Sequence, residues 1–274
     1  MYDLAAIEAA LKETIFTGKL HFSPVTGSTN SDALAAARAG APHGSVYLAD
    51  EQLAGRGRGD HRWESAAGQG LYVSVLLRPA AVSSRHVPLF PLAAGLAASY
   101  AVFVAAGLKV DLRWPNDLLI SPAQATAWGP RSSERKAGGI LVESKTDSDM
   151  LAFAVVGVGI NVHQRTFAPD LATPATSLDL EAGRTVSRQE LLIALLKSLE
   201  RETCSMHDPA IPAVIPARVA QVSTWLWNRR VEVHGPQACV GVTAGLDENG
   251  FLRVNTGNGI VTVQTGGIRA AKTD

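Results

Sequence analysis

The chain has 274 residues, and its 25 Lys and Arg residues balance its 25 Asp and Glu residues, so the formal net charge is zero. A hydrophobic content of 46% with 18% charged residues excludes a disordered chain, and the length allows one large domain or two unequal ones. Zero net charge argues against a broad electrostatic surface for DNA or anionic membranes, and two distant cysteines exclude a disulfide framework and a zinc site.

The N-terminal segment has the pattern of an amphipathic helix. Leu4, Ile7 and Leu11 recur at helical spacing within residues 3–16, and Asp3 is a plausible N-cap. The segment lacks a basic start followed by a long apolar run, so no signal peptide is predicted. Because the cysteine usage is also typical of a reducing compartment, we expect a cytoplasmic protein.

The body of the chain predicts helices and strands in irregular order. A polar turn at 26–30 leads into an Ala-rich helix. Another helix is expected at 187–203, where Ser187 and Glu190 have capping-box spacing, and a further one within 212–227. Strands are predicted at 46–49, 71–77, 110–114, 118–120, 139–143 and 153–162.

An uncharged segment at 87–108 has the length of a membrane span. It is mostly Ala and is interrupted by Pro and Gly, so its transfer into lipid would be weak compared with that of a Leu/Ile-rich span. Proline in a first helical turn and glycine near a helix end are ordinary helix boundaries. We therefore predict a buried helix that starts near Pro91 and ends near Gly107.

From Arg230 onward the chain consists of short β-rich runs separated by Gly, Asp or Asn, which predicts a small all-β module. A boundary near Asn228 gives two domains, at 1–227 and 228–274. Because strands and helices do not alternate regularly in the first domain, the predicted fold class is α+β with a mixed or antiparallel sheet. A polar insertion at 121–135 is expected to be a surface loop and has no assigned role.

A loop of alternating glycine and arginine has the composition of an anion site. In Gly55, Arg56, Gly57 and Arg58, backbone N–H groups can approach an anion closely while two guanidinium groups supply positive charge. A flexible surface turn and a short RNA-binding segment remain alternatives. The spacing is not that of a dinucleotide fingerprint, because Asp60 stands where glycine is needed, and no P-loop motif occurs.

Three further segments place polar groups or glycines at strand ends. Residues 113–117 read Arg-Trp-Pro-Asn-Asp, and the proline would present the last two side chains at a turn. Lys136 precedes a glycine pair and an apolar strand, and the strand at 157–161 contains two glycines, which indicates a ligand or a backbone lying close by. Alone, the first segment could be an Asx turn and Lys136 a solvated lysine.

Taken together and in order, these segments resemble those of the biotin protein ligases. That family shows a Ser-Thr-Asn turn, a Gly-Arg-Gly-Arg loop followed by Trp, a (Lys/Arg)-Trp-Pro-Asn-Asp strand end, a Lys before Gly-Ile-Leu, and a G-x-G-x-N strand. The matching positions are 28–30, 55–58 with Trp63, 113–117, Lys136 with 139–141, and 157–161. The resemblance implies a catalytic domain of the class II aminoacyl-tRNA synthetase/biotin synthetase type and a C-terminal SH3-like β-barrel.

The resemblance also implies an activity. Members of the family activate biotin with ATP and Mg²⁺ to give biotinyl-5′-AMP and pyrophosphate, and then transfer biotin to a specific lysine of a biotin carboxyl carrier protein or domain of a carboxylase. Joining two anions requires positive charge, and the mixed anhydride needs no enzyme nucleophile. No metal ligands are assigned, since Mg²⁺ would arrive with ATP.

The roles of individual residues follow from the same match. The catalytic residues would be Lys136 and Arg58, which hold the carboxylate and phosphate oxygens, and Asp117, which helps to orient the acceptor lysine. The residues that would bind biotin and the adenylate are Ser28, Thr29, Asn30, Gln52, Gly55, Arg56, Gly57, Arg58, Trp63, Asn116, Lys136, Gly138 and Asn161.

The chain departs from the family at two points. Many bacterial members carry further arginines in the loop, where this chain has Gly59 and His61, and this puts the tightness of adenylate binding in doubt. Some members carry an N-terminal helix-turn-helix, which needs about three helices. One helix is predicted before Ser28, so no DNA binding is expected. Family members are monomers or sheet-edge homodimers, and the dimer is favoured here.

Two other functions stay open. A lipoate ligase or other acyl ligase shares the fold, and the Gly-Arg loop with the 113–117 segment favours biotin over lipoate. A non-catalytic biotin-responsive regulator or nucleic-acid binder is disfavoured by the neutral charge.

Overall fold

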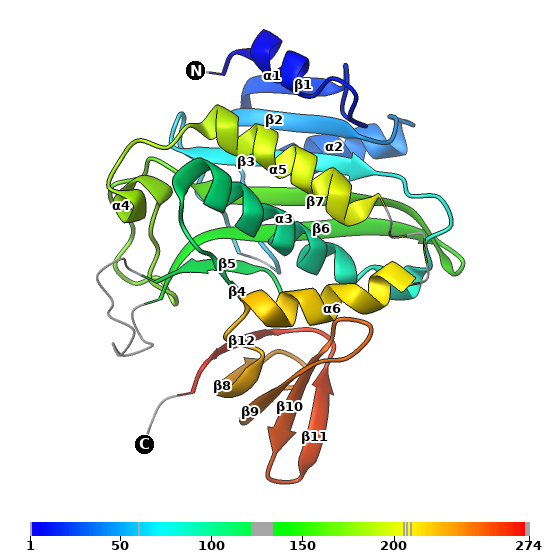
Figure 1. The fold of residues 1–274 in the computed structure, drawn as a ribbon, viewed down its shortest axis with the longest axis vertical. Helices are drawn as coiled ribbons and strands as arrows, with labels where there is room; N and C mark the ends of the chain where they lie inside the picture. Colours follow the sequence, from blue (N-terminus) through cyan, green and yellow to red (C-terminus); the bar gives the residue numbers. More distant parts are fainter. Residues whose placement is uncertain are drawn as a thin grey trace.

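The computed structural model describes residues 2–59, 61–121, 134–204, 206, 208 and 210–271. Among these residues, seven strands form a central sheet in the order β1-β2-β3-β7-β6-β5-β4 (Figure 1). β1 runs parallel to β2 and every other neighbouring pair is antiparallel, so the predicted mixed α+β fold is confirmed. The strands are β1 (Leu20–Thr26), β2 (Ser45–Gln52), β3 (Gly70–Leu77), β4 (Asp111–Arg113), β5 (Asp117–Ile120), β6 (Arg135–Asp147) and β7 (Met150–Asn161).

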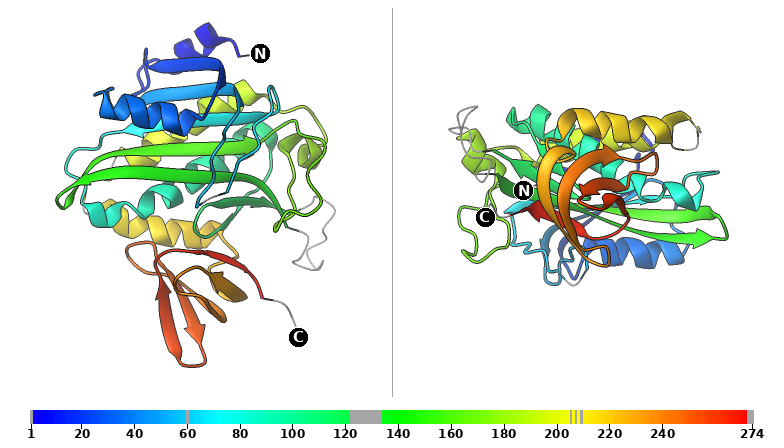
Figure 2. Two further views of the ribbon diagram at one scale, coloured as in Figure 1. Left: turned by 180° about the vertical axis from the view of Figure 1, so that it is seen from behind. Right: turned by 90° about the horizontal axis from the view of Figure 1, so that it is seen from below.

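Helices cover the two faces of this sheet unequally. The long helices α3 (Leu89–Ala106) and α5 (Arg188–Thr203) lie against one face and enclose the main hydrophobic core, with α6 (Ala210–Val222) beside α3. The short helix α2 (Thr29–Arg38) packs on the other face near β3 and β7, over a small second core. The rest of that second face is crossed by the segment that follows β2 (Figure 2, left).

The uncharged helix α3 lies inside the fold. Of the helices in the described residues, it is the one long and apolar enough to span a membrane, and 72% of it is buried. Its glycine and alanine residues allow close approach to the sheet, and Gly107 ends the helix in the left-handed conformation with φ of 73°. The prediction of a buried helix is therefore confirmed, with its start two residues before Pro91.

The N-terminal helix is shorter than expected. α1 covers Leu4–Ala10, with Asp3 as its N-cap accepting from the amide of Ala6 at 3.0 Å. Glu13 has φ of 71°, which no residue inside an α-helix can adopt, so the chain leaves the helix and turns Phe16 into the core. The prediction of a helix over 3–16 was wrong in its second half.

Several elements were not predicted. The edge strand β1 contains Pro24 and lacks a clean hydrophobic alternation, and α4 (Leu178–Ala182) is a single short turn of helix. β6 extends beyond the predicted strand at both ends, and β7 begins three residues earlier than predicted. The end of β6 at the hairpin turn is polar and exposed, so it lacks the apolar signal of a buried strand. The insertion at 121–135 lies, apart from its ends, outside the described residues.

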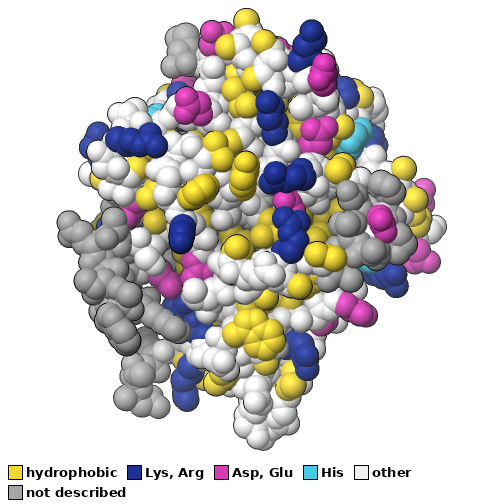
Figure 3. Space-filling model, in the orientation of Figure 1, with side chains coloured by type: hydrophobic (Ala, Val, Ile, Leu, Met, Phe, Trp, Pro, Cys, Tyr) yellow, Lys and Arg dark blue, Asp and Glu magenta, His cyan; other side chains and the backbone are white. Residues whose placement is uncertain are grey.

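The C-terminal strands form a second, antiparallel sheet in the order β11-β10-β9-β8-β12. Its strands are β8 (Trp227–His234), β9 (Cys239–Leu246), β10 (Leu252–Thr256), β11 (Gly259–Val263) and β12 (Gly267–Ala270), the last of which was not predicted. It lies next to α6 (Figure 1). On the helix-covered side of the molecule, basic and acidic side chains are intermixed (Figure 3), in keeping with the zero net charge.

Candidate active site

A polar cluster forms where α2 begins. Ser28 is the N-cap, and the first helical residue, Thr29, is turned toward the sheet. The amide and hydroxyl of Thr29 both donate to Oε1 of Gln52, at 2.9 and 3.1 Å, and its hydroxyl lies 2.8 Å from that of Ser74. Asn30 accepts from the Ser74 hydroxyl at 2.6 Å. The cluster is buried and preorganised, with hydrogen-bonding groups suited to a polar ring.

Glycines on two neighbouring strands form a flat surface beside this cluster, here called the glycine floor: Gly139, Gly157 and Gly159. The amide of Asn30 lies directly over Gly157, where a Cβ atom would come within 2.0 Å of Asn30 Oδ1. The indole of Trp63 lies over Gly159, where a Cβ atom would come within 2.7 Å of Nε1. Glycine is therefore required at both positions because side chains lie flat against the backbone.

The segment 55–63, which contains the Gly-Arg loop and is here called the tongue, folds over the glycine floor (Figure 2, left). The amide of Gly57 donates to the carbonyl of His61 at 2.7 Å, and that of Trp63 donates to the carbonyl of Gly55 at 2.9 Å. A Cβ atom on Gly55 would lie 2.3 Å from the Trp63 carbonyl, so the tongue closes only because position 55 is glycine. Asp60, near its tip, lies outside the described residues.

The two arginines of the tongue point to different partners. Arg56 forms a bidentate ion pair with Glu143 on β6, one bond of which measures 3.1 Å. Arg58 donates to the hydroxyl of Thr265 at 2.9 Å and to the carbonyl of Gly266, both ahead of β12 in the second sheet. Burial lowers the pKa of Arg58 and the charge of Asp117 opposes that shift, which places Arg58 within electrostatic range of the carboxylate.

Lys136 reaches the site because of an irregularity in β6. Leu118 pairs with Gly138 and Leu119 pairs with Lys136, so Ala137 is an extra residue on this strand. Ala137 is buried in the main core, whereas the Lys136 ammonium group lies 5.6 Å from the ring centroid of Trp63. The bulge therefore turns Lys136 onto the same side as the glycine floor, as bulges beside active sites commonly do.

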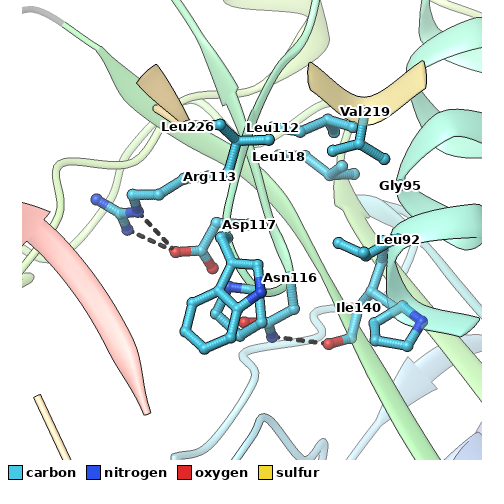
Figure 4. A pocket seen from close by; sticks show the side chains of 13 residues that line it. Leu92, Gly95, Leu112, Arg113, Asn116, Asp117, Leu118, Ile140, Val219 and Leu226 are labelled. Atoms are coloured by element: carbon cyan, nitrogen blue, oxygen red, sulfur yellow. Dashed lines mark hydrogen bonds and ion pairs between the residues drawn. The ribbon is translucent and has the colours of Figure 1, made fainter. Parts of the chain in front are cut away.

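Asp117, the first residue of β5, lies between two cations. Its Oδ1 lies 2.5 Å from Lys136 Nζ, and its Oδ2 accepts from Nε and a terminal nitrogen of Arg113 at 3.0 and 2.5 Å (Figure 4 shows the Arg113 pair). Burial alone would raise the pKa of Asp117, but the charges of Lys136 and Arg113 outweigh it and the pKa is lowered. The carboxylate is thus ionised and holds both cations in place.

The pocket in Figure 4 lies behind this turn, on the core side of the sheet. Its walls are mainly apolar and come from α3, α6 and the strands, including Leu92, Leu112 and Val219. The amide of Asn116 donates to the carbonyl of Ile140 at 2.8 Å, and the Ile140 amide donates back to the Asn116 carbonyl at 3.0 Å. Asn116 therefore stabilises the turn, although the sequence suggested a ligand contact.

Two other residues predicted for the site, Gly138 and Asn161, do not face the glycine floor either. Gly138 faces Leu118 and Ile160 in the core, so its neighbour Gly139 is the residue that faces Trp63 and Lys136. Asn161 is buried and donates to the carbonyl of Thr176 at 3.0 Å. Thr176 in turn bonds to the backbone of Lys136, so Asn161 supports the site from its border.

The other residues predicted for the site lie together around the polar cluster, the tongue and the glycine floor. Three residues that sequence reasoning missed complete the arrangement: Ser74 in the polar cluster, Glu143 opposite Arg56, and Thr265 opposite Arg58. Ser74 is the one polar residue inside an apolar strand, and Glu143 falls on the same strand face as Gly139 by alternation, so both had a local signal. The contact of Thr265 with Arg58 had none.

The arrangement combines a polar ring-binding end with a cationic end. The polar cluster lies at one side of the glycine floor, and Lys136 lies at the other, with its ammonium group 5.6 Å from the Trp63 ring centroid. Arg58 is within electrostatic range of Asp117 at this end. Fixed positive charge in a partly enclosed site stabilises the joining of two anions. Within the described residues, no group of three or more His, Cys, Asp or Glu side chains is placed to hold a metal ion.

Comparisons with known proteins agree with this geometry. A model of the biotin/lipoate A/B protein ligase family matches residues 22–161. A biotin-[acetyl-CoA-carboxylase] ligase of Mycobacterium tuberculosis is 34% identical over 251 residues, which cover 89% of this chain and 85% of that protein. A bifunctional ligase/repressor BirA of Bacillus spizizenii is 30% identical over 267 residues, which cover 96% of this chain and 77% of that protein.

A solved structure shows the same fold. The biotin protein ligase from Aquifex aeolicus, in complex with biotin and ATP, superposes with a TM-score of 0.76 at 25% sequence identity. The match covers 93% of this chain and 100% of that one, so it includes both sheets.

Proposed function

Because the chain belongs to the biotin/lipoate A/B protein ligase family, among its biotin protein ligases, we propose how its residues carry out that activity. The enzyme activates biotin with ATP as biotinyl-5′-AMP and transfers biotin to a lysine of a biotin carboxyl carrier protein. The observation that carries the proposal is the meeting of Lys136, Trp63 and the glycine floor, next to the polar cluster around Thr29.

Biotin recognition is assigned to the polar cluster. Ser28, Thr29, Asn30 and Gln52 would surround the ureido ring, whose two N–H groups and one carbonyl need both acceptors and donors. Gln52 and Thr29 already restrain each other in this structure, so little ordering remains for the ligand to induce. The acyl chain would then run along the glycine floor toward Lys136.

Adenylate formation is assigned to the cationic end. An oxygen of biotin's carboxylate attacks the α-phosphorus of ATP, the bond from that phosphorus to the bridging oxygen breaks, and pyrophosphate leaves. Lys136 and Arg58 would neutralise the oxygens that approach each other, and Gly55, Arg56 and Gly57 would close the tongue over them. With Trp63 over the ligand, water would be kept from the anhydride.

Transfer needs no group of the enzyme to act as nucleophile. The neutral amine of the acceptor lysine attacks the acyl carbon of the adenylate, AMP leaves, and the amine loses one proton. Lys136 would stabilise the charge on the phosphate oxygen of the departing AMP. Asp117 is held by Lys136 and Arg113, so we assign it the orientation of the acceptor lysine's amine and of Lys136.

The described residues do not offer a protein cage for Mg²⁺. Asp117, the acidic group that contacts Lys136, is already paired with two cations. Magnesium commonly binds through nucleotide phosphates with few protein ligands. Mg²⁺ would therefore enter with ATP, and the residues named here act on the substrate oxygens.

Finer features of the fold are also proposed. The larger sheet and its helices are assigned to a class II aminoacyl-tRNA synthetase type catalytic domain at 1–227, and the five-stranded sheet to an SH3-like barrel at 228–274. The start of the second sheet at Trp227 supports that boundary. A cytoplasmic location, the absence of DNA binding and a sheet-edge homodimer stay predictions, open to cell fractionation, gel-shift and sedimentation measurements.

The test is to incubate the protein with Mg-ATP and either biotin or lipoate, and to detect the adenylate by mass. We expect biotinyl-5′-AMP and transfer of biotin to an apo carrier domain. Formation of lipoyl-AMP alone would instead show the lipoate ligase activity. Binding of biotin without any adenylate would show a non-catalytic regulator.

A further inference from the structure

A buried ion pair ties the second sheet to the strand that carries Lys136. Arg229, on β8, is 6% exposed and donates from its two terminal nitrogens to the two carboxylate oxygens of Glu134, at 3.1 and 3.0 Å. Glu134 lies two residues before Lys136, immediately ahead of β6. Bidentate geometry of this kind restrains direction as well as distance.

Trp225 extends the connection to the other side of the site. Its ring is 3% exposed and lies 3.4 Å from the guanidinium carbon of Arg229 and 5.2 Å from that of Arg113. Both contacts are within the range of cation–π interactions. Arg113 holds Asp117, and Asp117 holds Lys136.

The contacts therefore form a closed ring. It passes from Lys136 through Asp117, Arg113, Trp225, Arg229 and Glu134, and returns to Lys136 along the backbone of β6. The bulge at Ala137 sets the side of β6 on which Lys136 lies, but it does not fix where the long side chain points on that side. An additional restraint is thus expected at this position.

We propose that Glu134 and Arg229 are positioning residues that hold Lys136 in its catalytic orientation, so that the second sheet contributes to adenylate formation without touching the substrate. The proposal rests on the proposed role of Lys136. Loss of the Glu134 charge would leave Arg229 buried without its counterion, and the segment leading into β6 would lose its anchor. A small displacement of a catalytic group is enough to slow a reaction strongly.

The chain offers a matched control. Glu202 is 3% exposed and accepts from both terminal nitrogens of Arg218, so this pair has the same bidentate geometry, although its arginine is more exposed than Arg229. It joins α5 to α6, away from Lys136. Glu202→Gln removes a comparable ion pair from the helical layer. A purely structural role for Glu134 predicts that Glu134→Gln and Glu202→Gln affect stability and catalysis in the same way.

The experiment measures kcat for biotinyl-5′-AMP formation, the KM for biotin and urea unfolding for both variants. We expect Glu134→Gln to lower kcat about 10-fold or more while the KM for biotin changes less than about twofold. Glu202→Gln should lower the unfolding midpoint and leave kcat within about twofold. Wild-type kcat in Glu134→Gln, or an equal loss in both variants, would overturn the proposal.

Two further variants keep the outcome clear. If Glu134→Gln does not fold, Arg229→Lys retains the charge but not the bidentate geometry, and we expect a smaller fall in kcat. An Arg229→Lys enzyme with wild-type kcat would then contradict the proposal. Lys136→Ala is measured alongside: if it forms adenylate normally, the proposed role of Lys136 fails, whereas its loss of activity beside an unaffected Glu134→Gln refutes only the positioning role.

Discussion

Nζ of Lys136 lies 2.5 Å from Oδ1 of Asp117, and this contact joins the bulged start of β6 to the start of β5. It places the ammonium group next to the glycine floor and gives it a fixed counterion. Because Asp117 is largely buried, its ionised state depends on Lys136 and Arg113, which lower its pKa against the effect of burial. The ion pair therefore links the charge of Asp117 to the position of Lys136.

The stability of the protein should depend on the charge of Asp117 in acid. Its pKa is lower in the folded protein than in the unfolded chain, where the pKa of an Asp is about 3.9. The ion pairs therefore stabilise the fold above that pH, and the stabilisation is lost as the pH falls through the folded-state pKa. We expect the difference in unfolding free energy between wild type and Asp117→Asn to be largest near neutral pH and to shrink below about pH 4. Urea titrations across this range check it, and a difference independent of pH would contradict it.

The glycine floor should not tolerate a side chain under Asn30. In Gly157→Ala the new methyl group would lie 2.0 Å from Asn30 Oδ1, so Asn30 must move and its bond with Ser74 must break. Overpacking of this kind typically costs 1–3 kcal/mol, and we expect the KM for biotin to rise about 10-fold. Gly27→Ala is the control, because nothing lies within 4 Å of its Cβ position. Equal KM values for the two variants would argue against the placement of biotin beside Asn30.

Glu143 should influence biotin binding although the sequence motifs did not single it out. Its carboxylate holds Arg56 of the tongue and accepts from the amide of Asn30 at 2.9 Å. Glu143→Gln keeps the shape and removes the charge, which weakens charge-assisted bonds to both partners. We expect the Kd for biotin to rise about threefold to tenfold at low salt, with a smaller effect at high salt because the pair is partly exposed. Isothermal titration of biotin at two salt concentrations measures this, and an unchanged affinity at both would refute it.

The contact between Arg58 and the second sheet should order the tongue. Arg58→Ala removes the bonds to Thr265 and Gly266 as well as a cation near the phosphates, whereas Thr265→Val removes one hydroxyl and leaves the Gly266 carbonyl in place. We expect faster proteolysis within 55–63 for both variants, more so for Arg58→Ala, and a raised KM for ATP for Arg58→Ala. Identical cleavage rates in wild type and Arg58→Ala would show that the contact does not restrain the tongue.

Much of the site was predictable because its signals are local. The Gly-Arg loop, the turn at 113–117 and the paired glycines of β7 each need particular residue types at fixed short spacing, and their order identifies the family. The buried helix α3 was equally visible, since Pro and Gly mark its ends within a long apolar run. Glu143 carries a local signal of the same kind, since strand alternation puts it on the same face of β6 as Gly139.

Other features depend on contacts that short-range patterns do not report. The bulge at Ala137 decides that Gly139, rather than Gly138, faces the site, and it is visible only in the pairing of β5 with β6. Arg229 and Glu134 are 95 positions apart, and Arg58 and Thr265 are 207 apart. The early end of α1 depends on the packing of Phe16 in the core, which overrides the helical periodicity of its sequence.

The most direct test of the account is a single-turnover measurement of biotinyl-5′-AMP formation and biotin transfer to an apo carrier domain, by wild type and Lys136→Ala. We expect wild type to form the adenylate and transfer biotin. Lys136→Ala should bind biotin with near-normal affinity but form the adenylate about 100-fold more slowly or worse, because the charge that stabilises the joining of the two anions is lost. A Lys136→Ala enzyme that forms adenylate at the wild-type rate would contradict the central assignment.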